Sequence, residues 1–137
     1  MIEEFYSSMG RFEIFVFTLV FMILMHIISD FNLQTDFMSK FKQYKNWEPY
    51  NDSGKYTYDY QCVLFMHATS WSILTFFPLL LAYKDVLSYA LIVVFNIFIH
   101  KYIDNLKANK MKINLIQDQI FHFIQIFIAL GFVAIIH

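Results

Sequence analysis

The stretch VLSYALIVVFNIFIHKYID, residues 86–104, decides the fold. Before His100 its only strongly polar side chains are Ser88 and Asn96, and it ends at Asp104. A helix that crosses a bilayer needs about 20 consecutive, predominantly apolar residues, and this stretch meets that requirement. It therefore predicts a transmembrane helix that carries ionisable side chains at one end.

Three more apolar runs of similar length lie at residues 11–30, 61–83 and 114–136. Hydrophobic residues make up 58% of the 137 residues and aromatic residues 20%, and the excess is gathered in the four runs. We therefore predict one all-α domain, a four-helix transmembrane bundle embedded in a lipid bilayer. The formal net charge of −1 gives no electrostatic reason to expect nucleic-acid binding.

The segment between the first two runs, residues 31–60, is polar and is predicted to be a cytoplasmic loop. Phe37, Phe41 and Tyr44 recur in it at helical spacing, which predicts a short amphipathic helix over residues 35–45. Such a helix can lie in the membrane interface or, equally well, pack on other parts of the protein. The remainder of the segment combines turn-forming residues with five aromatic residues, so we expect an aromatic loop over one membrane face.

Basic residues are distributed unevenly between the two ends of the predicted helices. One end has only Arg11 and Lys84, whereas the other has eight lysines: Lys40, Lys42, Lys45, Lys55, Lys101, Lys107, Lys110 and Lys112. Because cytoplasmic loops carry an excess of Lys and Arg, both termini are predicted to lie outside the cytoplasm. The N-terminal residues lack the features of a signal peptide, so the first run is predicted to be a retained helix.

Histidine and aspartate residues gather at the lysine-rich ends of the four runs. They are His26, Asp30, His67, His100, Asp104, Asp118 and His122. Six of them form three His–Asp pairs that are four residues apart, a spacing that puts both side chains on one face of a helix. The predicted topology places all seven at the cytoplasmic face and at similar depth.

Ionisable groups buried among membrane helices are costly and are usually functional. Imidazole and carboxylate groups on facing helices suit zinc, manganese or iron better than calcium or magnesium. We therefore predict that the seven residues bind one or two divalent metal ions. A single His–Asp pair at a helix end is more often a local hydrogen bond. For the whole set, the alternative is a proton relay or a structural polar cluster.

Other polar residues near these positions are expected to support the site. Lys107 follows Asp104 by three residues and is predicted, with Gln34, to contact an anionic substrate, although the excess of cytoplasmic lysines also explains its presence. Lys40 is best explained by that excess alone. Four amides are candidates to orient the ligands: Gln34, Asn96, Gln117 and Gln119.

The order of these residues resembles that of a known family. The motifs are His-x-x-x-Asp-Phe-x-x-Gln from His26 to Gln34, then Lys40 and His67, then His-x-x-x-Asp-x-x-Lys ending at Lys107, then Asp-Gln-x-x-His from Asp118. The chain resembles domain-of-unknown-function family 3307, small four-helix membrane proteins of bacteria and their phages. It is also loosely similar to predicted membrane-bound metal-dependent hydrolases. The resemblance implies a bacterial inner-membrane protein, encoded by a bacterium or a phage.

The leading functional hypothesis is a metal-dependent hydrolase. A bound divalent ion lowers the pKa of water, and an aspartate among Asp30, Asp104 and Asp118 that is not engaged with metal can act as general base. Because lysines surround the predicted site, the expected substrate is an anionic phosphoester, either a lipid head group or a nucleotide. The alternatives are a metal or proton carrier, and a non-catalytic membrane module that metal stabilises and that binds a host partner.

Overall fold

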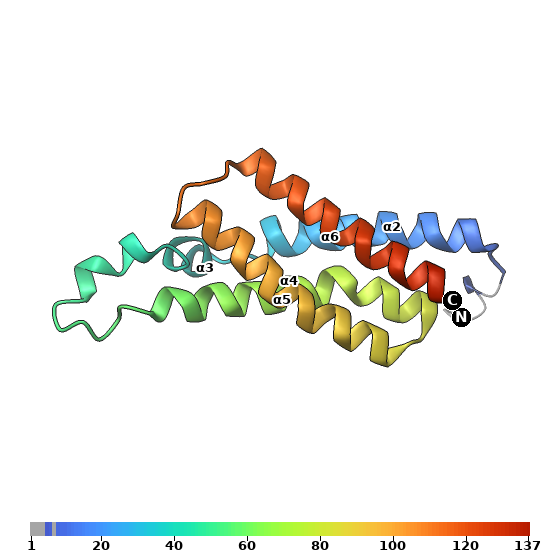
Figure 1. Cartoon of the computed structure of the whole chain (residues 1–137), viewed down its shortest axis with the longest axis horizontal. Coiled ribbons are helices and arrows are strands. Elements are labelled where there is room, and N and C mark those ends of the chain that lie inside the picture. The colour runs from blue at the N-terminus through green and yellow to red at the C-terminus, as the bar shows by residue number, and fades with distance from the viewer. Residues whose placement is uncertain (1–4, 7) are drawn as a thin grey trace.

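The computed structural model describes residues 5–6 and 8–137, and this part of the chain contains helices and no strand (Figure 1). The predicted all-α class is confirmed. The long elements are α2 (Arg11–Ile27) with its π-helical continuation η1 (Ile28–Asn32), α4 (Asp59–Tyr83), α5 (Val86–Ala108) and α6 (Leu115–Ile136). All four are long and apolar enough to cross a membrane, with mean hydropathies from 1.5 to 2.3.

Helix α4 occupies the centre of the bundle. It packs most extensively on α5 and on α2, while α6 lies against α2 and α5 (Figure 1). The core that they enclose is apolar and includes the fully buried Met22, Trp71, Phe76, Ile126 and Leu130. Because α4 contacts the other three long helices, its own side chains are the most buried of the four.

The π-helical turn η1 changes the direction of the residues that follow α2. Its signature is the hydrogen bond from the Leu33 N–H to the Ile28 carbonyl, five residues back, at 2.8 Å. His26, just before this turn, and Asp30, within it, both face α4 and α6. His26 contacts Trp71 and Gln119, and Asp30 contacts His67 and the same Gln119 amide. Single π-helical turns are frequently found at functional sites.

The two ends of the bundle differ in composition. The Arg11 end of α2 and the Ile136 end of α6 lie together, and the lysine-rich connections lie at the opposite end (Figure 1). At the first end, Asp85 caps α5 by accepting from the backbone N–H of Ser88 at 3.0 Å. The hydrogen bond from the Ser88 hydroxyl lowers the pKa of Asp85 to about 2. The ring of His137 lies 3.2 Å from the same carboxylate.

The segment between α2 and α4 contains three short helices: α3 (Asp36–Phe41), η2 (Tyr44–Asn46) and η3 (Glu48–Tyr50). Helix α3 is shorter than the predicted helix over residues 35–45. It ends early because side chains take its last carbonyls: Asn46 donates to Lys40 at 2.6 Å, and the Trp47 indole donates to Phe41 at 2.7 Å. Helix α3 packs against α4, so one of its faces is covered by protein.

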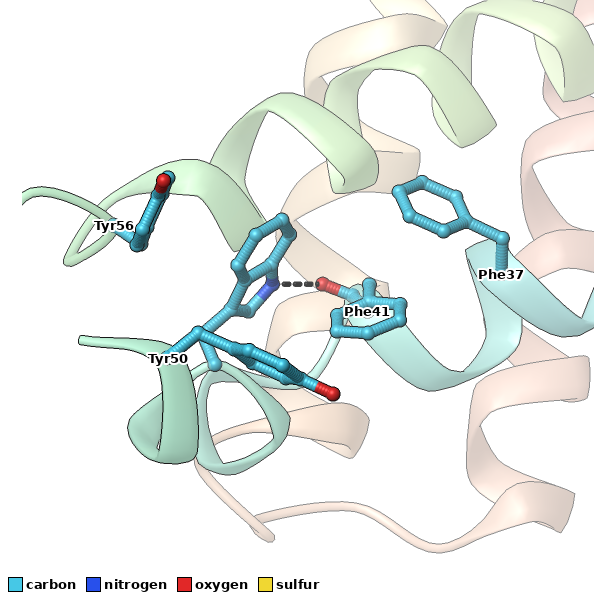
Figure 2. A pocket seen from close by; sticks show the side chains of 5 residues that line it. Phe37, Phe41, Tyr50 and Tyr56 are labelled. Carbon is cyan, nitrogen blue, oxygen red and sulfur yellow. Dashed lines mark hydrogen bonds between the residues drawn. The ribbon is translucent and has the colours of Figure 1, made fainter.

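The aromatic residues of this segment form a pocket of about 590 Å³. Figure 2 shows the rings of Phe37, Phe41, Tyr50 and Tyr56 around it, and Trp47 completes the lining. The Phe41 and Trp47 rings meet edge to face with their centroids 4.9 Å apart. The aromatic loop is therefore a packed substructure that fixes the end of α3.

Helix α6 begins with a reciprocal cap that offers a direct test of the fold. The Asn114 side chain accepts from the Gln117 N–H at 2.9 Å, and the Gln117 side chain accepts from the Asn114 N–H at 3.0 Å. We predict that Asn114→Ala destabilises the detergent-purified protein by about 1 kcal/mol, whereas Asn114→Ser retains most of the stability. Thermal unfolding followed by circular dichroism measures both. Equal losses in the two variants would show that the cap does not stabilise α6.

Candidate metal centre

Six of the seven predicted ligands converge at the lysine-rich end of the bundle. They form three groups, namely Asp30 with His67 and His100, His100 with Asp104 and His122, and Asp30 with Asp118 and His122. Within each group the potential ligand atoms lie within 4.8 Å of one another, and all six side chains are buried. These residues can therefore hold a metal ion. A second ion would have to share a ligand, because any two of the groups have one residue in common.

The distances between potential ligand atoms fit a small metal ion. The Nε2 atom of His67 lies 3.3 Å from Asp30 Oδ1 and 3.4 Å from Asp104 Oδ2. The Nε2 atom of His122 lies 3.5 Å from Asp118 Oδ1. Two ligands of one tetrahedral ion, each about 2.1 Å from it, are about 3.4 Å apart. The cluster therefore has the spacing of a ligand set.

Several polar atoms in the cluster are buried without a hydrogen-bond partner. They are His67 Nε2, both ring nitrogens of His100 and of His122, and the Oδ1 atoms of Asp104 and Asp118. A buried polar atom with no partner costs about 1–3 kcal/mol, so such a concentration calls for a ligand. A divalent ion can accept a lone pair from the oxygens and from one nitrogen of each ring, whereas the other nitrogen of a neutral imidazole carries a proton and needs an acceptor.

Aromatic stacking holds two of the histidine rings in place. The Trp71 ring stacks on His100 with centroids 4.1 Å apart, and His100 stacks on His122 with centroids 4.3 Å apart. Trp71 is fully buried and belongs to the apolar core. It therefore separates the cluster from the rest of the bundle. Sequence reasoning missed Trp71, although it lies four residues after His67 on α4.

His26 does not belong to any of the three groups, and its predicted role as a metal ligand does not fit its contacts. The Trp71 indole N–H donates to His26 Nδ1 at 2.8 Å. An indole N–H can only donate, so Nδ1 accepts and the proton of a neutral ring is on Nε2. Nε2 then donates to Gln119 Oε1 at 3.1 Å. Neither nitrogen has a lone pair free for a metal ion.

Gln119 forms hydrogen bonds both to His26 and to two of the candidate ligands. With its Oε1 held by His26, its Nε2 donates to Asp30 Oδ2 at 3.0 Å and to Asp118 Oδ2 at 3.2 Å. One amide thus orients two carboxylates from different helices. Of the four amides predicted to orient ligands, only Gln119 does so. Gln117 belongs to the α6 cap, Asn96 donates to the Ile92 carbonyl of its own helix, and the Gln34 amide nitrogen is buried without a partner.

Two lysines neutralise carboxylates of the cluster. Lys107 faces the cluster as predicted for a substrate contact, since its ammonium group donates to Asp118 and lies 3.9 Å from Asp104 Oδ1. Lys42, which sequence reasoning did not single out, is buried and donates to Asp104 Oδ2 at 2.8 Å. Gln34, the other predicted substrate contact, makes no hydrogen bond to these residues within the described part of the chain.

The charges of the cluster do not cancel. The two ammonium groups balance two of the three carboxylates, so one negative charge is uncompensated when the histidines are neutral. An unpaired buried charge is strongly destabilising, by about 3–5 kcal/mol when a partner is removed. A proton on one of the histidines or a bound cation would balance this charge.

No protein-family model matches this chain, and neither a curated protein nor a solved structure matches it. The resemblance to domain-of-unknown-function family 3307, with the bacterial or phage origin that it implies, stays a prediction. Any functional conclusion therefore rests on the chemistry of the site.

The role of Gln119 can be separated from that of the ligands. We predict that Gln119→Ala weakens metal binding about 10- to 100-fold, because residues that orient ligands typically contribute that much to affinity. Gln117→Ala, on the same turn of α6 but outside the cluster, leaves the affinity unchanged. Competition with a chelator of known affinity measures both values. Equal affinities in the two variants would contradict the role assigned to Gln119.

Proposed function

We propose that the chain is an integral membrane protein whose four long helices cross the bilayer. The distribution of its side chains supports this proposal. Large apolar residues are exposed along α2, α5 and α6, among them Val20, Leu91, Phe95, Phe98, Ile128 and Ile135. The charged groups of the cluster are buried instead. A water-soluble protein rarely exposes so continuous an apolar surface, whereas helices in lipid do so and keep ionisable groups inside.

We propose further that the lysine-rich end faces the cytoplasm and that both termini lie outside it. The excess of lysines at that end supports this orientation. In this arrangement α3 and the aromatic pocket lie at the cytoplasmic interface, where Trp and Tyr side chains are enriched in membrane proteins. The candidate metal centre then lies just inside the bilayer, close to its cytoplasmic face.

For the metal centre we propose metal-dependent hydrolysis of an anionic phosphoester. The observation that carries this proposal is the convergence of six buried ligand-type side chains, with unpartnered lone pairs, beside two lysines. Each of the three groups offers three protein ligands. Catalytic zinc sites have three protein ligands and keep one position open, whereas structural sites fill all four.

In the proposed reaction, the oxygen of a water molecule attacks phosphorus, the bond from phosphorus to the leaving alcohol breaks, and a proton of the water passes to that alcohol. A bound divalent ion lowers the pKa of the water and polarises a phosphoryl oxygen. Asp104 and Asp118 each accept from a lysine with Oδ2, while their Oδ1 atoms lie 3.8 Å and 3.5 Å from His122 Nε2. Whichever of the two does not bind the ion can relay the proton.

The lysines have a second part in this scheme. An ammonium group has three donors, so Lys42 and Lys107 can pair with carboxylates and still donate to phosphoryl oxygens. Asp30 is a weaker candidate for the base, because Gln119 and His67 already contact its two oxygens. Its place in two of the three ligand groups supports a role in binding the ion.

A carrier function has less support. A transported ion or proton needs polar groups along the whole path through the bundle. Beyond Trp71 the described core contains fully buried apolar side chains such as Met22, Ile126 and Leu130. The hydroxyl groups of Thr18, Ser72 and Thr75 are also fully buried there, but none of them is ionisable near neutral pH. The six candidate ligands lie at the lysine-rich end of the bundle only. This placement suits a site that acts on substrates from one membrane face better than it suits a path across the membrane.

Hydrolysis of a chromogenic phosphodiester and phosphomonoester by the detergent-purified protein tests the proposal, with zinc, manganese or iron(II) added in turn. We predict metal-dependent turnover that a chelator abolishes. His100→Ala should lower kcat by about 100-fold or more, because a catalytic ion supplies several kcal/mol of transition-state stabilisation. His137→Ala, at the opposite end, should retain it. If the protein binds stoichiometric metal but hydrolyses neither ester, the proposal of hydrolysis is contradicted, and the alternative of a non-catalytic membrane module that metal stabilises takes its place.

A further inference from the structure

A groove of about 430 Å³ runs along the bundle between α5 and α6. It forms where α5 packs more closely on α4 than on α6. Exposed apolar residues form its rims, namely Leu91 and Phe95 on α5 with Ile128 and Phe132 on α6. In the proposed membrane orientation these rims face the hydrocarbon of the bilayer, so the groove is open to lipid along its length.

One polar side chain in this apolar groove has no hydrogen-bond partner among the residues that the structure describes. Gln125 lines the groove, is only 7% exposed, and has neither a hydrogen-bond acceptor for Nε2 nor a donor for Oε1. Asn96, which lies across from it on α5, satisfies its amide nitrogen with the Ile92 carbonyl at 2.9 Å. A free carboxamide in an apolar channel is costly, so the groove points to an occupant that is apolar and carries a hydrogen-bonding group at this position.

The groove reaches to within one helical turn of the candidate metal centre. Asn96 lies four residues before His100 on α5, and Gln125 lies three residues after His122 on α6, so each shares a helix face with a ligand. From Ile99 the groove continues to Ser88, which at 1.5 Å per residue is about 16 Å. Ser88 lies in the first turn of α5, at the end of the bundle opposite to the lysine-rich end. The groove therefore leads from the neighbourhood of the candidate metal centre toward the opposite end of the bundle.

We infer that the substrate of the metal centre is an anionic glycerolipid, with one acyl chain in this groove. This inference rests on the proposed function and narrows its substrate class. The phosphate lies by Lys42 and Lys107, the ester carbonyl accepts from the Gln125 amide, and the chain follows the groove toward Ser88. Along the protein, the lysines, the Gln125 amide and the apolar groove follow one another in the same order as the phosphate, the ester carbonyl and the acyl chain of such a lipid. A nucleotide has no part that fills the groove.

Photolabelling tests the inference with the full chain in phosphatidylcholine nanodiscs. The probe is phosphatidic acid with a diazirine at the end of one acyl chain, and peptide mass spectrometry maps the labelled residues. We expect labels on Leu91, Phe95, Ile128 and Phe132, and their loss when unlabelled phosphatidic acid is added. Val20 on α2, which is similarly exposed to lipid, should show only the background that bulk lipid produces.

The Gln125→Leu variant tests the polar contact without changing the width of the groove much. It should compete about fivefold less well for diacyl phosphatidic acid, the worth of one neutral hydrogen bond, and should not change competition by the dialkyl ether analogue. Labelling spread evenly over Val20 and the groove residues would overturn the inference. A detergent-stable dimer that Ala129→Trp dissociates would also overturn it, because a second copy of the chain would then fill the groove.

The same experiment separates this inference from the proposed catalysis. Specific groove labelling in a protein that hydrolyses no phosphoester would sustain the lipid site and refute hydrolysis. Hydrolysis of the chromogenic esters without groove labelling would sustain catalysis and refute the lipid substrate.

Discussion

The burial of three carboxylates in an otherwise apolar helix bundle is the constraint on which the rest of the structure depends. Asp30, Asp104 and Asp118 are at most 6% exposed. Buried charges are tolerated only when other groups in the protein compensate them. Lys42 and Lys107 supply two ammonium groups, Gln119 supplies two N–H bonds, and the histidines lie at ligand distance from the remaining oxygens. Every helix and the segment between α2 and α4 contribute to this compensation.

That constraint also accounts for the irregular elements of the fold. The π-helical turn η1 contains Asp30, which contacts His67 on α4 and Gln119 on α6. Helix α3 ends at Phe41, where Asn46 and Trp47 take its carbonyls, and the next residue, Lys42, reaches Asp104. Asn109 fixes the residues that follow α3, since its side chain donates to the Lys42 carbonyl at 3.1 Å and accepts from the Tyr44 N–H at 2.6 Å. The loop is therefore part of the site.

Much of the arrangement followed from hydropathy and spacing. Four apolar runs predict the helical fold, and the position of histidine and aspartate at the same ends of those runs predicts that they meet. The structure brings six of the seven together. His26 lies outside the three groups, which the sequence could not show because its partners, Trp71 and Gln119, come from other helices. Lys42 was missed because nothing in a polar loop indicates which lysine turns inward.

The rotation of each helix about its own axis could not be predicted from the sequence either. Gln117 and Gln119 are two residues apart, so they point to different sides of α6, and only the packing of α6 on α2 decides which one meets Asp30. The groove between α5 and α6 depends on how closely two helices approach, which hydropathy does not encode. Gln125 lies in the middle of α6, and nothing in the sequence indicates that the packed bundle leaves its amide without a partner among the described residues.

Elemental analysis of the detergent-purified protein tests the central claim most directly, with wild type measured beside Asp104→Ala, His122→Ala and His137→Ala. The account predicts about one or two equivalents of zinc, manganese or iron per chain in the wild type and in His137→Ala, and loss of the metal in the other two variants. Absence of metal from every sample, even after reconstitution with each ion, would contradict it. The cluster would then be a hydrogen-bonded polar network.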